Sequence, residues 1–428
     1  MTARVILGRI MSSLGGKPRG TRRAERLVGL LRTLISERGE ATGAVLARRA
    51  VALYRGLDAE GRAHLFDKLA HEFSPDPVAV LQAAVAYHSR PDAGSLAVLQ
   101  RVTEPPRQEV FRRMNMAPGG TATLLELRRE LLAAQAASPQ LAAVDHDLAH
   151  LLQSWFNRGF LELRRIDWNT PASILEKLIT YEAVHRIHGF PDLKRRLERD
   201  RRCLAFFHPA LPDEPLIFVE VALLDEVPHE VAPILEMESA VADPRKARCA
   251  VFYSITSCQA GLKGVSFGNF LIKQVAEDLH AELPGIKIFA TLSPVPGLRH
   301  WVGKAAPALA ANADSDLAAR RPELERLAAS YLTQAWSEGA SLDPVARFHL
   351  GNGARLERIN WMADPSPRGI AQSFGIMVNY VYDLGDVERN HEEYVKRHRV
   401  VSSTVVDKLA REAALLVESG ARAPISSP

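Results

Sequence analysis

The chain has 428 residues, 47% of them apolar, and a formal net charge of +4. This length allows two or three domains, and the apolar content is typical of a globular protein. Because no run of about 18 apolar residues occurs, the composition argues against a membrane-spanning protein. Beyond Glu25 the basic residues are interleaved with acidic ones, which argues against a nucleic-acid-binding stripe.

The first residues are basic and free of acidic side chains. Such a segment is typical of a solvated tail or of a mitochondrial transit peptide, and its weak amphipathicity favours the tail. The three cysteines are too few and too irregularly spaced for a disulfide framework or a zinc cluster, so we expect reduced thiols. These features predict a cytoplasmic protein, with the mitochondrial matrix as the alternative. The residues concerned are Arg4, Arg9, Lys17, Arg19, Arg22, Arg23, Cys203, Cys249 and Cys258.

Residues 22 to about 165 carry one helical pattern after another and no strand pattern. The first places Leu27, Leu30, Leu31, Leu34 and Ile35 on one face and ends at Gly39. We therefore predict an all-α bundle over residues 1–165, with a role in oligomerisation. The other helical segments are residues 41–57, 59–73, 75–90, 121–137 and 141–161.

One motif in this half imitates a zinc site. The segment "HDLAH" places His146 and His150 four residues apart, as in zinc proteases. Asp147, however, stands where those enzymes need the longer glutamate, and no third ligand is recognisable downstream. We interpret the two histidines as ordinary helix residues and predict no metal site.

The pattern changes near Trp168, where β-type segments begin to alternate with helices. Alternation of this kind predicts an α/β domain with a mixed sheet over residues 166–428, and hence an α+β protein overall. The strand-like segments are "CLAFFHP", "EPLIFVEVALL", "KARCAVFYSIT", "GIKIFATLS", "ARLERINW" and "FGIMVNYVYDL".

A glycine-containing turn between a strand and a helix is a candidate phosphate site. Small residues there let the backbone approach a ligand, and the N–H groups of the following helix suit a pyrophosphate. A plain turn remains the alternative from spacing alone. The candidate residues are Lys263, Gly264, Val265, Ser266, Phe267, Gly268 and Asn269.

Two further residues stand in unusual local settings. Ser293 lies between Leu292 and Pro294, with another proline two residues on, and this limits its backbone freedom. His349 lies at the end of the helical segment "PVARFHLG", just before a glycine-containing turn. By themselves these patterns also describe a turn serine and a helix-capping histidine.

The chain resembles the malonyl-CoA decarboxylase family over most of residues 168–382. The resemblance implies a catalytic domain similar to the Gcn5-related acetyltransferases, with residues 263–269 as its pyrophosphate loop. It also implies that His349 donates a proton and that Ser293 holds the departing carboxylate and relays protons. The motifs are "HPALPDEPLIFVEVAL", "YSITSCQAGLKGVSFGNFLIK", "TLSPVPG", "FHLGNGARLERINWMAD" and "SFGIMVNYVY".

The resemblance further implies decarboxylation of malonyl-CoA to acetyl-CoA without a metal or organic cofactor, because the thioester itself accepts the electron pair. Self-association as a dimer or tetramer would accompany it, with neither nucleic acid nor membrane as partner. Ser266 departs from a glutamate common in animal members, so another group must orient His349. The alternatives are a CoA-dependent acyltransferase, a decarboxylase of malonyl-carrier protein, and a non-catalytic CoA-binding or scaffolding protein. A Ser–His hydrolase is disfavoured, because Ser293 lacks the Gly-x-Ser-x-Gly elbow.

Overall fold

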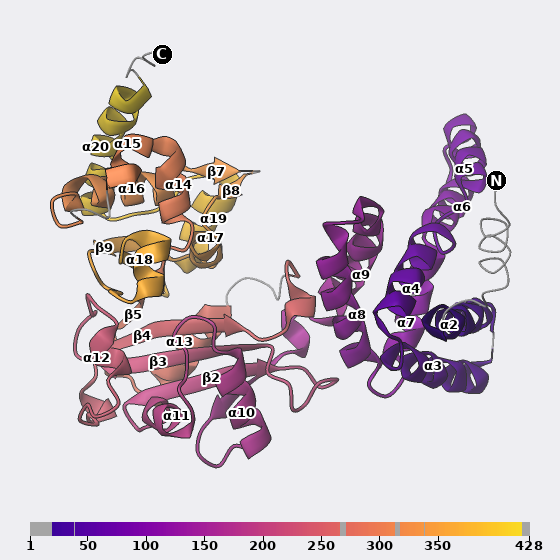
Figure 1. Cartoon of the computed structure of the whole chain (residues 1–428), viewed down its shortest axis with the longest axis horizontal. Helices are drawn as coiled ribbons and strands as arrows, with labels where there is room; N and C mark the ends of the chain where they lie inside the picture. Colours follow the sequence, from indigo (N-terminus) through magenta and orange to yellow (C-terminus); the bar gives the residue numbers. More distant parts are fainter. Residues whose placement is uncertain (1–18, 38, 266–270, 313–316, 338, 422–428) are drawn as a thin grey trace, which may run out of the picture. The chain divides into compact units, whose positions relative to one another are not determined.

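The computed structural model describes residues 19–37, 39–265, 271–312, 317–337 and 339–421 (Figure 1). Contacts divide the chain into two units. The first comprises residues 1–160, 209–211 and 259–266, and the second comprises the rest. The division into domains after residue 165 stays a prediction. The basic N-terminal stretch up to Pro18 lies outside the described residues.

The first unit is helical in its described residues. Leu27, Leu31 and Leu34 of its first helix are buried, as their spacing predicts. Asp58, Asp76 and Asp92 cap three of its helices by accepting backbone N–H groups. Its helices are α2 (Arg19–Ser36), α3 (Glu40–Arg55), α4 (Ala59–His71), α5 (Pro77–Ser89), α6 (Ala93–Thr103), α7 (Pro106–Asn115), α8 (Gly120–Gln135) and α9 (Ala142–Trp155), with short turns η1 (Pro139–Leu141), η2 (Arg158–Phe160) and η4 (Ala260–Leu262).

The second unit is built on an eight-stranded mixed sheet. Its main path runs β1-β2-β3-β4-β5-β10-β6, and β9 pairs with β10. Among the described strands of this sheet, β4 and β5 pair in parallel and the other strand pairs are antiparallel. The expected α+β class is therefore confirmed. The strands are β1 (Glu162–Ile166), β2 (Arg201–Phe207), β3 (Ile217–Leu224), β4 (Cys249–Ser257), β5 (Ile288–Thr291), β6 (Ser293–Pro294), β9 (Arg355–Asn360) and β10 (Met377–Tyr382), with β7 (Trp336–Ser337) and β8 (Ala340–Ser341) as a separate pair.

Strand β1 corrects the sequence analysis, which expected no strand before residue 165. The segment alternates charged and apolar residues weakly, and its strand form depends on antiparallel pairing with β2. The helices of the second unit are α10 (Ala172–Tyr181), α11 (Phe190–Arg196), α12 (Ala232–Leu235), α13 (Leu271–Glu282), α14 (Leu298–Ala305), α15 (Pro307–Asn312), α16 (Arg321–Gln334), α17 (Pro344–Gly351), α18 (Pro367–Ser373), α19 (Val387–Arg397) and α20 (Thr404–Ala421), with η3 (Pro244–Lys246). Among the described residues, none of the helices has the apolar length that a bilayer crossing requires.

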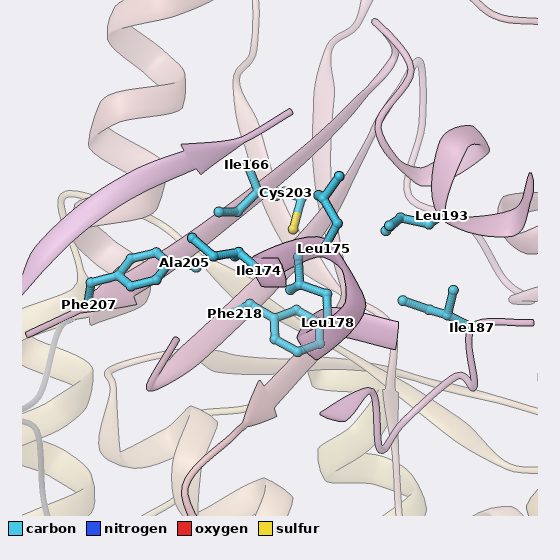
Figure 2. Packing of buried hydrophobic residues seen from close by; sticks show 10 residues of the cluster. All are labelled: Ile166, Ile174, Leu175, Leu178, Ile187, Leu193, Cys203, Ala205, Phe207 and Phe218. Carbon is cyan, nitrogen blue, oxygen red and sulfur yellow. The ribbon is translucent and has the colours of Figure 1, made fainter. Parts of the chain in front are cut away.

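One face of the sheet is covered by α10 and α11 (Figure 2). Leu178 of α10 packs in one buried cluster with Phe207 of β2 and Phe218 of β3. Fully burying one such side chain contributes roughly 1.5–3 kcal/mol. This packing fixes the strands that precede the candidate site. The three cysteines are free thiols, as their spacing predicts.

Candidate active site

Ser293 is held in extended backbone by strand pairing. It begins β6, directly after β5, and β10 pairs with both: Val378 lies opposite Ser293, and Tyr382 lies opposite Phe289. Pro294 continues the short strand and restricts the backbone further. The side chain of Ser293 is therefore aimed by a sheet, and the residue is 5% exposed.

His349 comes from the last turn of α17, as the sequence predicts. Asp343 caps this helix by accepting the N–H groups of Val345 and Ala346, and Pro344 occupies the first turn. The chain then turns at Gly353, whose φ is +81° and where an added Cβ would lie 2.1 Å from the carbonyl oxygen of Val387. Glycine is needed at this turn, because both the backbone conformation and the space exclude a side chain.

The structure brings the two predicted catalytic residues together. The Ser293 Oγ lies 3.0 Å from His349 Nε2 and donates a hydrogen bond of 2.9 Å to Thr291 Oγ1. On the other side of the ring, His349 Nδ1 lies 2.8 Å from the hydroxyl of Tyr382. Because the Ser293 proton points to Thr291, this pattern assigns the ring proton to Nε2. Nδ1 then accepts the O–H of Tyr382.

Burial keeps the imidazole of His349 neutral. The residue is 3% exposed, and desolvation lowers its pKa to about 3. Its ring stacks on Tyr380, with ring centroids 4.7 Å apart. Burial also raises the pKa of Tyr382, so its hydroxyl stays protonated and remains a hydrogen-bond donor. The group that faces Ser293 near neutral pH is therefore an uncharged N–H donor.

Asp343 links the segment after Ser293 to the helix that carries His349. Its Oδ1 caps α17, while its Oδ2 accepts the N–H of Gly297 at 3.3 Å and the hydroxyl of Tyr331 at 3.4 Å. One carboxylate thus fixes both halves of the pair. Its hydrogen bonds to α17 and to Gly297 are accepted from backbone N–H groups.

A cavity of about 220 Å³ opens onto the pair. Its walls are largely apolar, and Ser293 and His349 supply polar atoms to it. The register of β3 and β4 shifts at Glu220/Val221, and the two neighbours Phe252 and Tyr253 both reach the cavity. Such a bulge re-aims side chains beside a site. The other lining residues are Val184, Ile217, Ile255, Ser257, Leu292, Pro294, Pro344, Val345 and Phe348.

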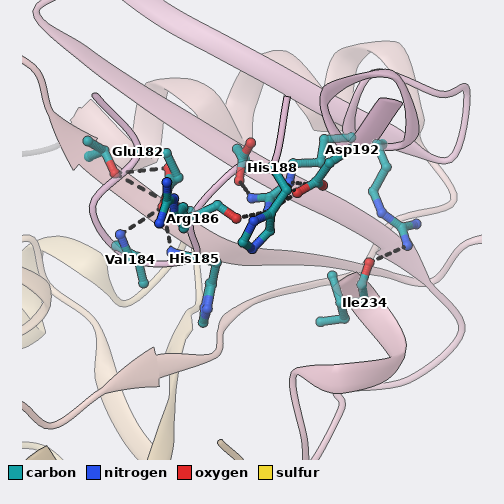
Figure 3. A network of polar contacts seen from close by, with 12 residues as sticks. Glu182, Val184, His185, Arg186, His188, Asp192 and Ile234 are labelled. Carbon is teal, nitrogen blue, oxygen red and sulfur yellow. Dashed lines mark hydrogen bonds and ion pairs between the residues drawn. The ribbon is translucent and has the colours of Figure 1, made fainter. Parts of the chain in front are cut away.

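The wall around Val184 is fixed by a buried polar network (Figure 3). The carboxylate of Glu182 accepts the N–H groups of Val184 and His185 at 2.8 and 2.7 Å. It also accepts the hydroxyls of Ser254 and Thr256 on β4. His185 is buried, and desolvation lowers its pKa to about 4. These hydrogen bonds tie the loop next to the cavity to strand β4.

The predicted pyrophosphate loop is described only at its start. Lys263, Gly264 and Val265 belong to the first unit, and Gly264 has a φ of +76°. Ser266, Phe267, Gly268 and Asn269 lie outside the described residues. The role of all seven residues in CoA binding stays a prediction.

The histidines of the zinc-like motif lie on α9. Asp147 between them is buried and pairs with Arg107 at 2.5 Å, and it accepts a hydrogen bond from Gln108. Over the described parts of the chain, no cluster of His, Cys, Asp and Glu with metal-binding geometry includes them. Asp147 therefore has a structural role within the helical unit.

Sequence reasoning missed three residues around the pair. The apolar pattern of the segment "FGIMVNYVYDL" explains Tyr380 and Tyr382 as packing residues of a strand; they are buried, but both also contact His349. Their spacing of two residues on β10 places them on one face, which was an available signal. Thr291 precedes Ser293 by the same spacing of two residues, so extended backbone brings their two hydroxyls to one face.

The chain matches the models of one protein family over most of its length. The models of the malonyl-CoA decarboxylase N-terminal and C-terminal domains match residues 73–156, and 159–319 with 308–419. Mitochondrial malonyl-CoA decarboxylase of Anser anser anser is 37% identical over 409 residues, which cover 83% of this chain and 81% of that protein. The Rattus norvegicus protein of the same name is 32% identical, and the alignment covers 85% of this chain and 84% of that protein.

Two crystal structures of proteins with this name have the same fold. That from Rhodopseudomonas palustris is 49% identical, has a TM-score of 0.86, and the alignment covers 90% of this chain and 99% of that one. That from Agrobacterium vitis is 44% identical with a TM-score of 0.84, with the same coverage. The likeness therefore includes both the helical part and the part built on the sheet.

Proposed function

Because this chain belongs to the malonyl-CoA decarboxylase family, we propose that it converts malonyl-CoA to acetyl-CoA and CO2 through Ser293 and His349, without a metal or organic cofactor. The observation that carries the mechanism is the 3.0 Å contact between Ser293 Oγ and His349 Nε2 at an apolar cavity. An enolate must be stabilised and protonated there, and this pair offers one hydroxyl and one neutral N–H.

The bond that breaks joins the α-carbon to the carboxylate carbon. Its electron pair moves into the thioester, which gives CO2 and an enolate. The proton on His349 Nε2 then passes to the α-carbon, and solvent replaces it. The O–H of Tyr382 supports this step, because it donates to Nδ1 as the ring loses its proton.

Ser293 acts on the carboxylate before it leaves. Its hydroxyl is kept in place by Thr291, which also accepts the backbone N–H of Tyr380. A carboxylate placed among Leu292, Val345 and Phe348 loses hydration, and this favours the uncharged CO2. The site thus holds the group that leaves without stabilising it strongly in the ground state.

The CoA portion is assigned to the loop at residues 263–269, where Lys263 supplies a positive charge and Gly264 the close approach of backbone. Self-association as a dimer or tetramer stays a prediction. So does a cytoplasmic location, since the curated relatives are named as mitochondrial proteins.

The test is an assay of the purified, chelator-treated protein with malonyl-CoA labelled in the free carboxylate. We expect labelled CO2 and one equivalent of acetyl-CoA, with no free CoA and no need of an amine acceptor. Release of free CoA would support acyl transfer or hydrolysis instead. Turnover of malonyl-carrier protein but not of malonyl-CoA would reject the substrate assignment.

A further inference from the structure

Arg128 of α8 is a buried cation that joins two helices to a distant turn. It is 3% exposed, its Nε donates to Asp145 Oδ1 of α9 at 2.8 Å, and its Nη1 donates to the carbonyl oxygen of Gly261 at 2.8 Å. Removing one partner of a buried hydrogen-bonded ion pair lowers the free energy of unfolding strongly, whereas removing an arginine from a surface ion pair lowers it little. The guanidinium therefore fixes the backbone of Gly261 relative to α8 and α9.

The turn at Gly261 also packs directly on the backbone of α8. A Cβ added to Gly261 would lie 2.2 Å from the carbonyl oxygen of Leu125. No side chain fits at this distance without moving the turn. Helix α8 thus holds η4 by steric fit as well as by the Arg128 hydrogen bond, and both contacts lie within the first unit.

Lys263 follows this anchored turn by two residues. Together with Gly264 it lines a cleft of about 640 Å³ whose other walls come from α8 and α9, including Arg128, Gln135 and His146. The backbone between Gly261 and Lys263 is tied by further turn hydrogen bonds, from Leu262 N to Gln259 and from Lys263 N to Ala260. The position of the Lys263 backbone is therefore set by the helical unit.

We propose that Arg128 is a positioning residue for binding the phosphate-bearing end of the CoA thioester, because it holds the start of the loop that carries Lys263. The inference rests on the proposed function of that loop. A Lys263 backbone that is already held before binding avoids the entropic cost of fixing it on binding. The helical unit would then set substrate affinity, in addition to the oligomerisation role that its sequence suggests.

The experiment compares two substrates in the full-length protein. Malonyl-CoA has the phosphorylated nucleotide, whereas malonyl-pantetheine has the same reacting thioester without it. For Arg128→Gln we expect kcat/KM with malonyl-CoA to fall at least about tenfold through KM, with kcat changed less than about twofold. With malonyl-pantetheine kcat/KM should stay within about twofold of wild type. An equal loss with both substrates would overturn the proposal, because a general structural defect does not distinguish them.

Arg129→Gln is the matched control. It changes the next residue of α8, whose side chain is 58% exposed and whose ion pairs, over the part of the chain that the structure describes, are to Glu126 and Glu130 at 3.6 Å or more. We expect wild-type constants for this variant with both substrates. Arg128→Lys, which keeps the charge, should recover part of the lost affinity.

Two more variants separate the possible failures. If Arg128→Gln does not fold, Gly261→Ala tests the same anchor from the loop side, and it should raise KM for malonyl-CoA alone. Lys263→Ala tests the loop itself. If Lys263→Ala weakens turnover of malonyl-CoA more than that of malonyl-pantetheine, but the Arg128 and Gly261 variants do not, the positioning role alone is overturned. If Lys263→Ala affects both substrates equally, the loop assignment is rejected, and the inference with it.

Discussion

The hydroxyl of Tyr382 lies 2.8 Å from His349 Nδ1, on the side of the ring that faces away from Ser293. Because the Ser293 hydroxyl donates to Thr291, Nε2 carries the ring proton and is the donor in the site, and the Tyr382 hydroxyl donates to Nδ1. This hydroxyl replaces the carboxylate that orients the histidine in many Ser–His sites. A neutral partner suits this site, because a buried negative charge beside the ring would favour a charged imidazolium.

Removing either member of the central pair should abolish most of the turnover while the fold persists. For His349→Asn and Ser293→Ala we expect kcat to fall by about 10²–10⁴-fold, since positioned proton transfer contributes about that much. KM for malonyl-CoA should change little, because the nucleotide end binds elsewhere. Steady-state CO2 release measures both constants, and circular dichroism checks the fold.

His300→Asn is the control for the histidine variant. His300 lies on α14 and is exposed to solvent, so its loss should leave kcat unchanged. Near-wild-type turnover in both His349→Asn and Ser293→Ala would reject the site assignment. Loss in only one of them would show that the two residues do not act as a unit.

Tyr382→Phe should separate the hydroxyl from the packing of the ring. The change removes the donor to Nδ1 but keeps the edge contact with Phe252. A hydrogen bond worth about 1–1.5 kcal/mol corresponds to a loss of about tenfold in kcat. The measurement is kcat against pH for the variant and the wild type.

Tyr380→Phe is the matched control on the same strand. Its hydroxyl has no hydrogen-bond partner among the described residues, and its ring stacks on His349. Phenylalanine preserves the stack, so the loss in kcat should be much smaller than for Tyr382→Phe. Equal losses in the two variants would contradict the role assigned to the Tyr382 hydroxyl.

Local sequence patterns predicted the elements that carry the pair, but not the contacts between them. Pro344 and the glycine-containing turn correctly bounded the helix that carries His349, and the prolines correctly marked Ser293 as restrained. The assignment of both residues to one site came from the family resemblance. Their meeting depends on β10 pairing with both β5 and β6, and such long-range register is not encoded in any one segment.

Residues that serve both packing and chemistry were the hardest to predict. Tyr382 lies in an apolar strand pattern that a core residue explains equally well. Asp343 before Pro344 is a recognisable helix cap, but its second oxygen bonds to Gly297, far away in the sequence. A cap with a further partner looks the same in sequence as a cap without one.

Variants of Asp343 should distinguish capping from the link to Gly297. Asp343→Ala removes both, and we expect a loss of about 0.5–2 kcal/mol in the free energy of unfolding together with reduced kcat. Asp343→Ser keeps an oxygen that can cap α17 but has no second oxygen to accept the N–H of Gly297. Its kcat should therefore fall, while its free energy of unfolding changes little. Urea unfolding and CO2 release measure the two effects. Full activity in Asp343→Ala would show that the link does not position the pair.

Buried His349 and His185 should make the protein less stable in mild acid. Their folded pKa values, about 3 and about 4, lie below the ordinary 6.5, so between these limits the unfolded chain binds more protons. Their stabilising contribution is complete above pH 6.5 and is lost as pH falls towards 3. Each histidine adds a slope of up to about 1.4 kcal/mol per pH unit.

The slope can be tested with one histidine removed at a time. Urea unfolding at pH 7.5, 6 and 5 gives the free energy of unfolding of each protein. For His349→Asn and for His185→Asn it should fall less steeply with acid than for the wild type, by the slope that corresponds to the uptake of about one proton on unfolding. A wild-type slope in both core variants would mean that neither histidine is held neutral by burial, and the neutral N–H donor in the mechanism would lose its basis.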